Sequence, residues 1–106
     1  MPVADLTSIA NITLRAVGAD GETFPLGIAV GIPFVSERHG TRVCPLTLHP
    51  LWSKPNEVAG VDSLQAPCLA LRVARAMLDG FCEDGGQLMY EDGDPFPLDT
   101  YFGAAL

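Results

Sequence analysis

Residues 62–83 read DSLQAPCLALRVARAMLDGFCE and decide the fold, because they carry the clearest helical pattern in the chain. Apolar residues recur here at spacings of three and four, which gathers them on one side of a helix and leaves charged residues on the other. The apolar side is Ala66, Ala70, Val73, Ala74, Met77, Leu78 and Phe81, and the polar side is Gln65, Arg72, Arg75, Asp79 and Glu83. The pattern predicts a surface helix that packs on a sheet.

Both ends of this helix carry recognisable signals. Asp62 followed by Gln65 fits a capping box, in which the carboxylate accepts from backbone N–H groups and the Gln side chain reaches back. Pro67 lacks an N–H and predicts a bent or late-starting first turn. Gly85 and Gly86 predict the end of the helix, since glycine takes the left-handed conformation that closes a helix.

Three segments ahead of the helix alternate large apolar residues with small or polar ones, which is the two-residue period of a strand. They are residues 9–17, 23–35 and 42–49, and a turn at Gly18–Gly21 joins the first two as a hairpin. Pro45 lacks an N–H, so at least one side of the third strand is expected to be unpaired. Residues 50–60 are rich in breakers and predict an irregular crossing.

Residues 87–91 predict a short fourth strand, and the tail beyond them is expected to lie on the surface through Phe96, Tyr101 and Phe102. The alanine-rich helix face opposite large strand residues permits close packing of helix on sheet. The chain is therefore predicted to be a two-layer α+β domain, in which an antiparallel sheet of three to four strands (β-β-β-α-β) packs on one amphipathic helix.

Length and composition indicate one folded domain over residues 1–106. The chain is too short for two useful cores, and 48% apolar with 18% charged residues is typical of a globular protein. Cys44, Cys68 and Cys82 form no C-x-x-C pair and are expected to be free thiols. The N-terminus lacks signal-peptide features and no apolar run is long enough to span a membrane, so the expected location is the cytoplasm.

The charge of the chain is −7, and its distribution is uneven. Acids and bases cancel over residues 1–75, whereas residues 76–106 contain no Lys or Arg and seven acids: Asp79, Glu83, Asp84, Glu91, Asp92, Asp94 and Asp99. A negative field repels phosphate, so direct binding to nucleic acid or to an anionic membrane is not expected unless the arginines converge on one patch. A basic partner is favoured, although solvated acidic loops also fit a simpler role in solubility.

Candidate catalytic and metal-binding groups are weakly supported. Cys44 with His39 or His49 could form a thiolate and base, but strand alternation places Cys44 on the apolar face and His49 on the other. The cysteines and histidines lack the close spacing of zinc ligands, and Glu91–Asp94 lacks the ligand spacing of a calcium loop. No phosphate-binding glycine motif is present. We expect no catalytic residue, metal or cofactor, and a protein that is not an enzyme.

The string Gly60-Val61-Asp62-Ser63-Leu64-Gln65-Ala66, followed by Cys68-Leu69-Ala70-Leu71, resembles an uncharacterised family of small bacterial domains of unknown function. Gly31-Ile32-Pro33, Cys44-Pro45 and Leu88-Met89-Tyr90 fit other positions of that family's pattern. The chain departs from it at Pro67, where the family commonly has leucine. The resemblance implies a fold and no site, because the family carries no established activity.

The function predicted is binding to another protein through a basic surface on that partner. Such a small acidic module could block a basic active site or nucleic-acid channel, as immunity proteins and phage-encoded anti-defence inhibitors would. The residues expected to take part are Asp84, Glu91, Asp92, Asp94, Asp99, Arg72 and Arg75.

Two alternatives stay open. One is a homo-oligomeric accessory subunit, such as a homodimer, and the other is a small-molecule binder or enzyme that uses Cys44 or Arg72 and Arg75. Arg75 also has a simpler role available, as the partner of Asp79 one helical turn away.

Overall fold

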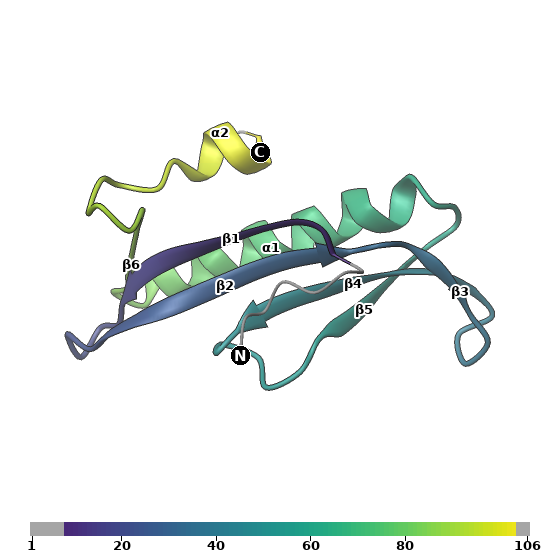
Figure 1. Ribbon diagram of the computed structural model, residues 1–106, viewed down its shortest axis with the longest axis horizontal. Helices are drawn as coiled ribbons and strands as arrows, with labels where there is room; N and C mark the ends of the chain where they lie inside the picture. Colours follow the sequence, from purple (N-terminus) through teal and green to yellow (C-terminus); the bar gives the residue numbers. More distant parts are fainter. Residues whose placement is uncertain (1–7, 104–106) are drawn as a thin grey trace.

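The computed structural model describes residues 8–103 and has two layers, a sheet and a helical layer on one of its faces (Figure 1). Within these residues the chain forms a six-stranded sheet and two helices. In chain order they are β1 (Ser8–Val17), β2 (Thr23–Gly31), β3 (Phe34–Ser36), β4 (Thr41–His49), β5 (Asn56–Gly60), α1 (Gln65–Glu83), β6 (Gln87–Met89) and α2 (Leu98–Phe102). The α+β class is as predicted, while three to four strands was an undercount.

All strand pairs are antiparallel, and the sheet follows the order β3-β4-β2-β1-β6, with β5 paired to β4. β2 pairs with the second half of β4, and β3 pairs with its first half. The short strand β3 therefore continues the line of β2, and β5 takes the other edge of β4. The hairpin predicted at residues 18–21 joins β1 to β2.

The predicted single strand over residues 23–35 is wrong, because the chain breaks between Gly31 and Phe34. Pro33 has no N–H to donate to a ladder, and Pro45 of β4 lies opposite this break, between the pairings to β2 and β3. A Cβ at Gly31 would come within 3.0 Å of the Pro45 ring. Gly31 thus allows a close approach to Pro45 that a larger residue would permit only if the proline ring shifted.

The predicted irregular crossing over residues 50–60 is also wrong in part, because Asn56–Gly60 forms β5. The segment NEVAG shows little apolar alternation, and its conformation comes from five paired positions along β4, from Arg42↔Gly60 to Leu46↔Asn56. A strand held mainly by its neighbour leaves a weak pattern in its own sequence.

Helix α1 begins as its sequence signals predict. Asp62 Oδ1 accepts from the N–H of Gln65 at 2.7 Å and of Leu64 at 3.0 Å, and Gln65 Oε1 accepts from Val61 N–H at 2.7 Å. The helix starts at Gln65, so Pro67 falls in its first turn, where proline is tolerated. The N–H groups of Ala66 and Cys68 on either side donate to the carbonyls of Asp62 and Leu64. A Cβ at Gly60 would lie 2.5 Å from the backbone nitrogen of Ala66, so only glycine permits this approach of strand to helix.

The core lies between α1 and the sheet. Buried alanines and one leucine of α1 face large apolar residues of β1, β2 and β4, which is the small-against-large packing expected from the sequence. The main side chains are Ala66, Ala70, Ala74 and Leu78 from the helix, and Leu14, Leu26, Ile28, Leu46 and Leu48 from the sheet. Met77, predicted on the buried stripe, is instead exposed at the edge of that stripe.

The segment after β6 folds back over the sheet beside α1 (Figure 1). Phe96 is buried in the core, and Leu98 and Phe102 pack against it. The tail is thus anchored through aromatic residues as predicted, but its helix α2 was not anticipated. No helix of residues 8–103 has the length and apolar character needed to cross a bilayer.

Candidate functional site

Seven carboxylates from three segments lie at one end of the molecule, which we call the acidic end. The β1–β2 hairpin, the end of α1 and the turn after β6 meet there (Figure 1), because β6 pairs with the last residues of β1 and Gly85 packs against Ala19. Their exposed acids are Asp20, Glu22, Glu83, Asp84, Glu91, Asp92 and Asp94.

These carboxylates are not neutralised by the protein's own cations. In the part of the chain that the structure describes, the ion pairs engage Glu57, Asp79 and Asp99, and none of the seven. Arg15 reaches the acidic end, but its guanidinium donates to the backbone oxygen of Glu91 at 2.7 Å. The acidic end therefore presents a net negative field to solvent.

Hydrogen bonds donated by backbone N–H groups fix the two acidic loops. Asp20 Oδ1 accepts from Glu22 N–H and Asp92 Oδ1 accepts from Asp94 N–H, both at 2.9 Å. The turn after β6 is closed further by Tyr90 N–H, which donates to the Asp94 carbonyl at 2.8 Å. The charges at this end are thus held on ordered turns and not on free tails.

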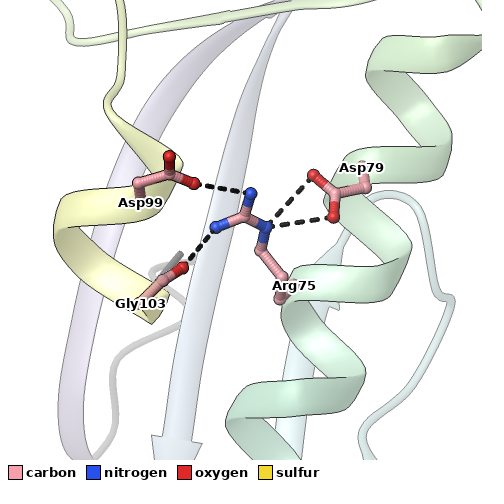
Figure 2. Close-up of polar contacts among 4 residues, drawn as sticks. All are labelled: Arg75, Asp79, Asp99 and Gly103. Atoms are coloured by element: carbon pink, nitrogen blue, oxygen red, sulfur yellow. Dashed lines mark hydrogen bonds and ion pairs between the residues drawn. The ribbon is translucent and has the colours of Figure 1, made fainter. Parts of the chain in front are cut away.

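A second group of acids is engaged within the domain by Arg75 (Figure 2). Its Nε donates to both Asp79 oxygens at 3.1 and 3.0 Å, while one terminal nitrogen lies 2.7 Å from Asp99 Oδ1 and the other donates to the Gly103 carbonyl at 2.7 Å. Hydrogen bonds to Asp99 and Asp79 raise the pKa of Arg75. Arg75 thereby joins α1 to α2.

This arrangement corrects the expected exposure of Arg75. Its side chain keeps only 16% of its accessible surface, because α2 folds over a helix face that the sequence pattern assigns to solvent. The predicted pair with Asp79 is present. Arg72, by contrast, is exposed as expected.

Among the predicted partner-binding residues, Asp84 directly follows α1, and Glu91, Asp92 and Asp94 lie in the turn after β6. These two segments reach the same end of the domain (Figure 1). Asp99 and Arg75 lie in the contact between the two helices, and Arg72 is on the exposed side of α1. Sequence reasoning did not place Asp20 and Glu22 with the others. Asp20 and Glu22 are far from the other acids in the sequence, and the pairing of β1 with β6 brings the β1–β2 hairpin to the same end of the domain.

Exposed apolar side chains gather at the opposite end of the sheet, beside the exposed Arg42, and we call it the apolar end. Val35, Arg42 and Gly60 share one row across β3, β4 and β5, which brings β3 close to the segment that leads into α1. Large apolar side chains are exposed on these segments: Ile32, Phe34, Val35, Val61 and Leu64. Val61 and Leu64 expose 77% and 72% of their surface, so they contribute little to the core. Neighbouring exposed apolar side chains of this kind can mark an interaction surface.

Cys44 and Cys82 are poorly suited to act as nucleophiles. Cys44 is fully buried, its thiol donates to the Gly31 carbonyl at 3.5 Å, and burial raises its pKa. Burial, with the nearby Asp79 charge, also raises the pKa of Cys82. Protonated thiols are poor nucleophiles. Among residues 8–103, no three His, Cys, Asp or Glu side chains are grouped as a metal site would require.

No protein-family model matches this chain, and neither a curated protein nor a solved structure matches it. The resemblance carried by residues 60–71 therefore remains a prediction. Gly60, Asp62 and Gln65 have a sufficient role in forming the start of α1, so no functional residue is transferred from it.

Proposed function

We propose that this protein is a protein-binding module whose acidic end docks on a basic surface of a partner. The observation that carries the proposal is the convergence of seven unpaired carboxylates from three chain segments on one end of the fold. Clustered charge of one sign raises the rate of encounter with a surface of the opposite sign and disfavours competitors of like sign. Occlusion of a basic active site or nucleic-acid channel is the activity that such docking would produce.

The placement of charge on α1 supports a role in binding. Glu83 ends the helix and Asp84 follows it, the last turn has no basic residue, and the first turn has no acidic one. Acids at a helix C-terminus meet the negative end of the helix dipole and destabilise the fold. A charge arrangement that opposes folding is better explained by an interaction outside the domain.

The proposed setting is the cytoplasm of a bacterium or of a cell infected by a phage, where immunity-type and anti-defence inhibitors act. The free thiols of Cys44, Cys68 and Cys82 fit a reducing compartment.

Affinity capture from the native host with three immobilised proteins tests the proposal. These are the wild type, the variant E83Q/D84N/E91Q/D94N, and the control E37Q, whose acid is exposed in the β3–β4 turn, away from the acidic end. We expect the wild type and the control to retain the same basic protein and the fourfold variant to lose it. Asn and Gln keep the shape and hydrogen-bonding oxygen of the acids, so the comparison isolates charge.

Equal retention of that protein by the fourfold variant and the wild type would show that the acidic end is not part of the interface. Circular dichroism and thermal melting of each variant establish that a lost interaction does not arise from unfolding. Because the replaced side chains are exposed, we expect all three proteins to fold.

The apolar end favours a second function, that of a homo-oligomeric accessory subunit. Exposed Val35, Val61 and Leu64 could be covered by a second copy around a two-fold axis. Light scattering over a range of concentrations tests this, together with the variant V61S/L64S. A dimer that the variant abolishes supports the second function, and a wild-type monomer at all concentrations rejects it.

A further inference from the structure

A groove of about 630 Å³ lies away from the helical layer, between two connections of the sheet. The β3–β4 turn supplies Arg38 and His39, and the segment leading into β5 supplies Lys54, Pro55 and Asn56. Pro45 of β4 and Glu57 of β5, which are paired across the sheet, complete the lining. Neither the predicted binding residues nor the acidic end contributes to it.

The charges of this groove differ in sign from those of the whole chain. Arg38 and Lys54 supply two positive charges, and Glu57 supplies one negative charge. Within the described residues neither Arg38 nor Lys54 takes part in an ion pair. Two cations from separate connections thus line one hollow, which is the convergence that an otherwise acidic protein needs in order to hold an anion.

His39 is held in a defined position. Its backbone N–H donates to Ser36 Oγ at 3.3 Å, and its Nδ1 lies 3.0 Å from Ser36 Oγ and 3.6 Å from Glu57 Oε1. Serine and glutamate both approach Nδ1, whereas a catalytic triad needs the acid on one ring nitrogen and the nucleophile on the other. The arrangement therefore positions the imidazole and leaves Nε2 as its second ligand-binding nitrogen.

We infer that this groove binds a compact anion carrying phosphate or carboxylate groups. The Arg38 guanidinium supplies paired donors that match a carboxylate or phosphate edge, and Lys54 supplies a point charge from the other connection. Asn56 adds amide donors, and the uncharged remainder of the lining is Pro45 and Pro55. Charge and hydrogen bonding, and not stacking on an aromatic surface, select this ligand.

Glu57 tunes the site. Its carboxylate lies in the same groove, 3.6 Å from His39 Nδ1, and its negative charge opposes a bound anion. Removal of the Glu57 charge therefore strengthens binding.

Chemical-shift titration of the full-length ¹⁵N-labelled protein with inorganic pyrophosphate and, separately, with citrate tests this site. We expect saturable shifts of the His39, Lys54 and Asn56 amides with at least one probe. The variant R38Q/K54Q should weaken binding about tenfold or more, and E57Q should strengthen it a few-fold. The control R42Q removes an exposed arginine that does not line the groove and should leave the affinity unchanged.

The inference is overturned if neither probe gives a saturable shift at these amides, or if R38Q/K54Q binds as tightly as the wild type. A similar loss in R42Q would also overturn it, because it would show a response to total charge instead of to this groove. The spectrum of each unliganded variant reports directly whether the domain is folded. None of these results depends on the partner proposed for the acidic end.

Discussion

The two ends of this domain expose different kinds of side chain to solvent. The acidic end carries seven unpaired carboxylates on ordered turns, whereas the apolar end exposes Val35, Val61 and Leu64. The longest dimension of the molecule is 42 Å and the ends lie along it (Figure 1), while salt screens charge over about 8 Å in the cell. The two surfaces can therefore act independently, one through long-range attraction and the other through contact.

The ends also differ in how their sequence serves the fold. At the apolar end, Gly60 and Asp62 make the approach of β5 to α1 possible and satisfy the first helical N–H groups. At the acidic end, Glu83 and Asp84 oppose the helix dipole. The residues at the start of α1 stabilise the fold, whereas the charges at its C-terminal end destabilise it. Substitutions at the two ends should therefore have opposite effects on the free energy of unfolding.

Substitution of Gly60 by Ala should have the largest effect, because it disrupts the close approach of β5 to α1 at the apolar end. The added Cβ would lie 2.5 Å from a backbone atom of α1, which cannot move without displacing the helix. We expect the free energy of unfolding to fall by about 3 kcal/mol in urea denaturation. The control G80A, where nothing lies within 4 Å of the new Cβ, should gain about 1 kcal/mol through helix propensity.

Substitution of Asp62 by Ala should lower the free energy of unfolding by about 1 kcal/mol, because two N–H groups at the start of α1 lose their acceptor. Asn keeps an acceptor oxygen, so D62N should retain most of the stability. Thermal melting of both variants measures the difference. Equal losses in D62A and D62N would assign the effect to charge and not to capping.

The double variant E83Q/D84N should stabilise the domain, in contrast to the two changes above. Removal of each negative charge from the C-terminal end of α1 should raise the free energy of unfolding by about 0.5 kcal/mol. Urea denaturation at low and high salt measures the gain, which should shrink as salt screens the dipole. A loss of stability would contradict the unfavourable charge placement on which the contrast between the ends depends.

Tyr90, which precedes the acidic turn, should give the smallest effect, confined to alkaline pH. A hydrogen bond to Tyr101 at 2.9 Å, followed by burial and nearby negative charge, raises its pKa to about 12. Its stabilising contribution is complete below the unfolded value of about pH 10 and is lost as pH rises through about 12. The difference in stability between wild type and Y90F should therefore shrink across that window, and a constant difference would contradict the assignment.

Much of the fold could be predicted because its signals are local. The helix start at Asp62, its end at Gly85 and the β1–β2 hairpin each depend on residues within a few positions of one another. Strand β5 was missed because its conformation depends on pairing with β4, and the break before β3 depends on Pro45 opposite Gly31. Such contacts between distant segments leave little trace in either segment alone.

The candidate site could likewise be predicted only where its signal is local in the sequence. The excess of acids after residue 76 is visible in the sequence, but their division into two groups is not. Helix α2 brings Asp99 to Arg75, and the β1–β6 pairing adds Asp20 and Glu22 to the acidic end. The groove at Arg38 and Lys54 likewise depends on two connections that are separated in the chain.

The proposed role of the acidic end is tested most directly by the rate at which the captured partner associates with the wild type and with E83Q/D84N/E91Q/D94N across a range of salt concentrations. The account predicts that the wild-type rate falls steeply with salt, and that the variant associates about tenfold more slowly at low salt with a shallow dependence. Superimposable rates and salt slopes for the two proteins would contradict it.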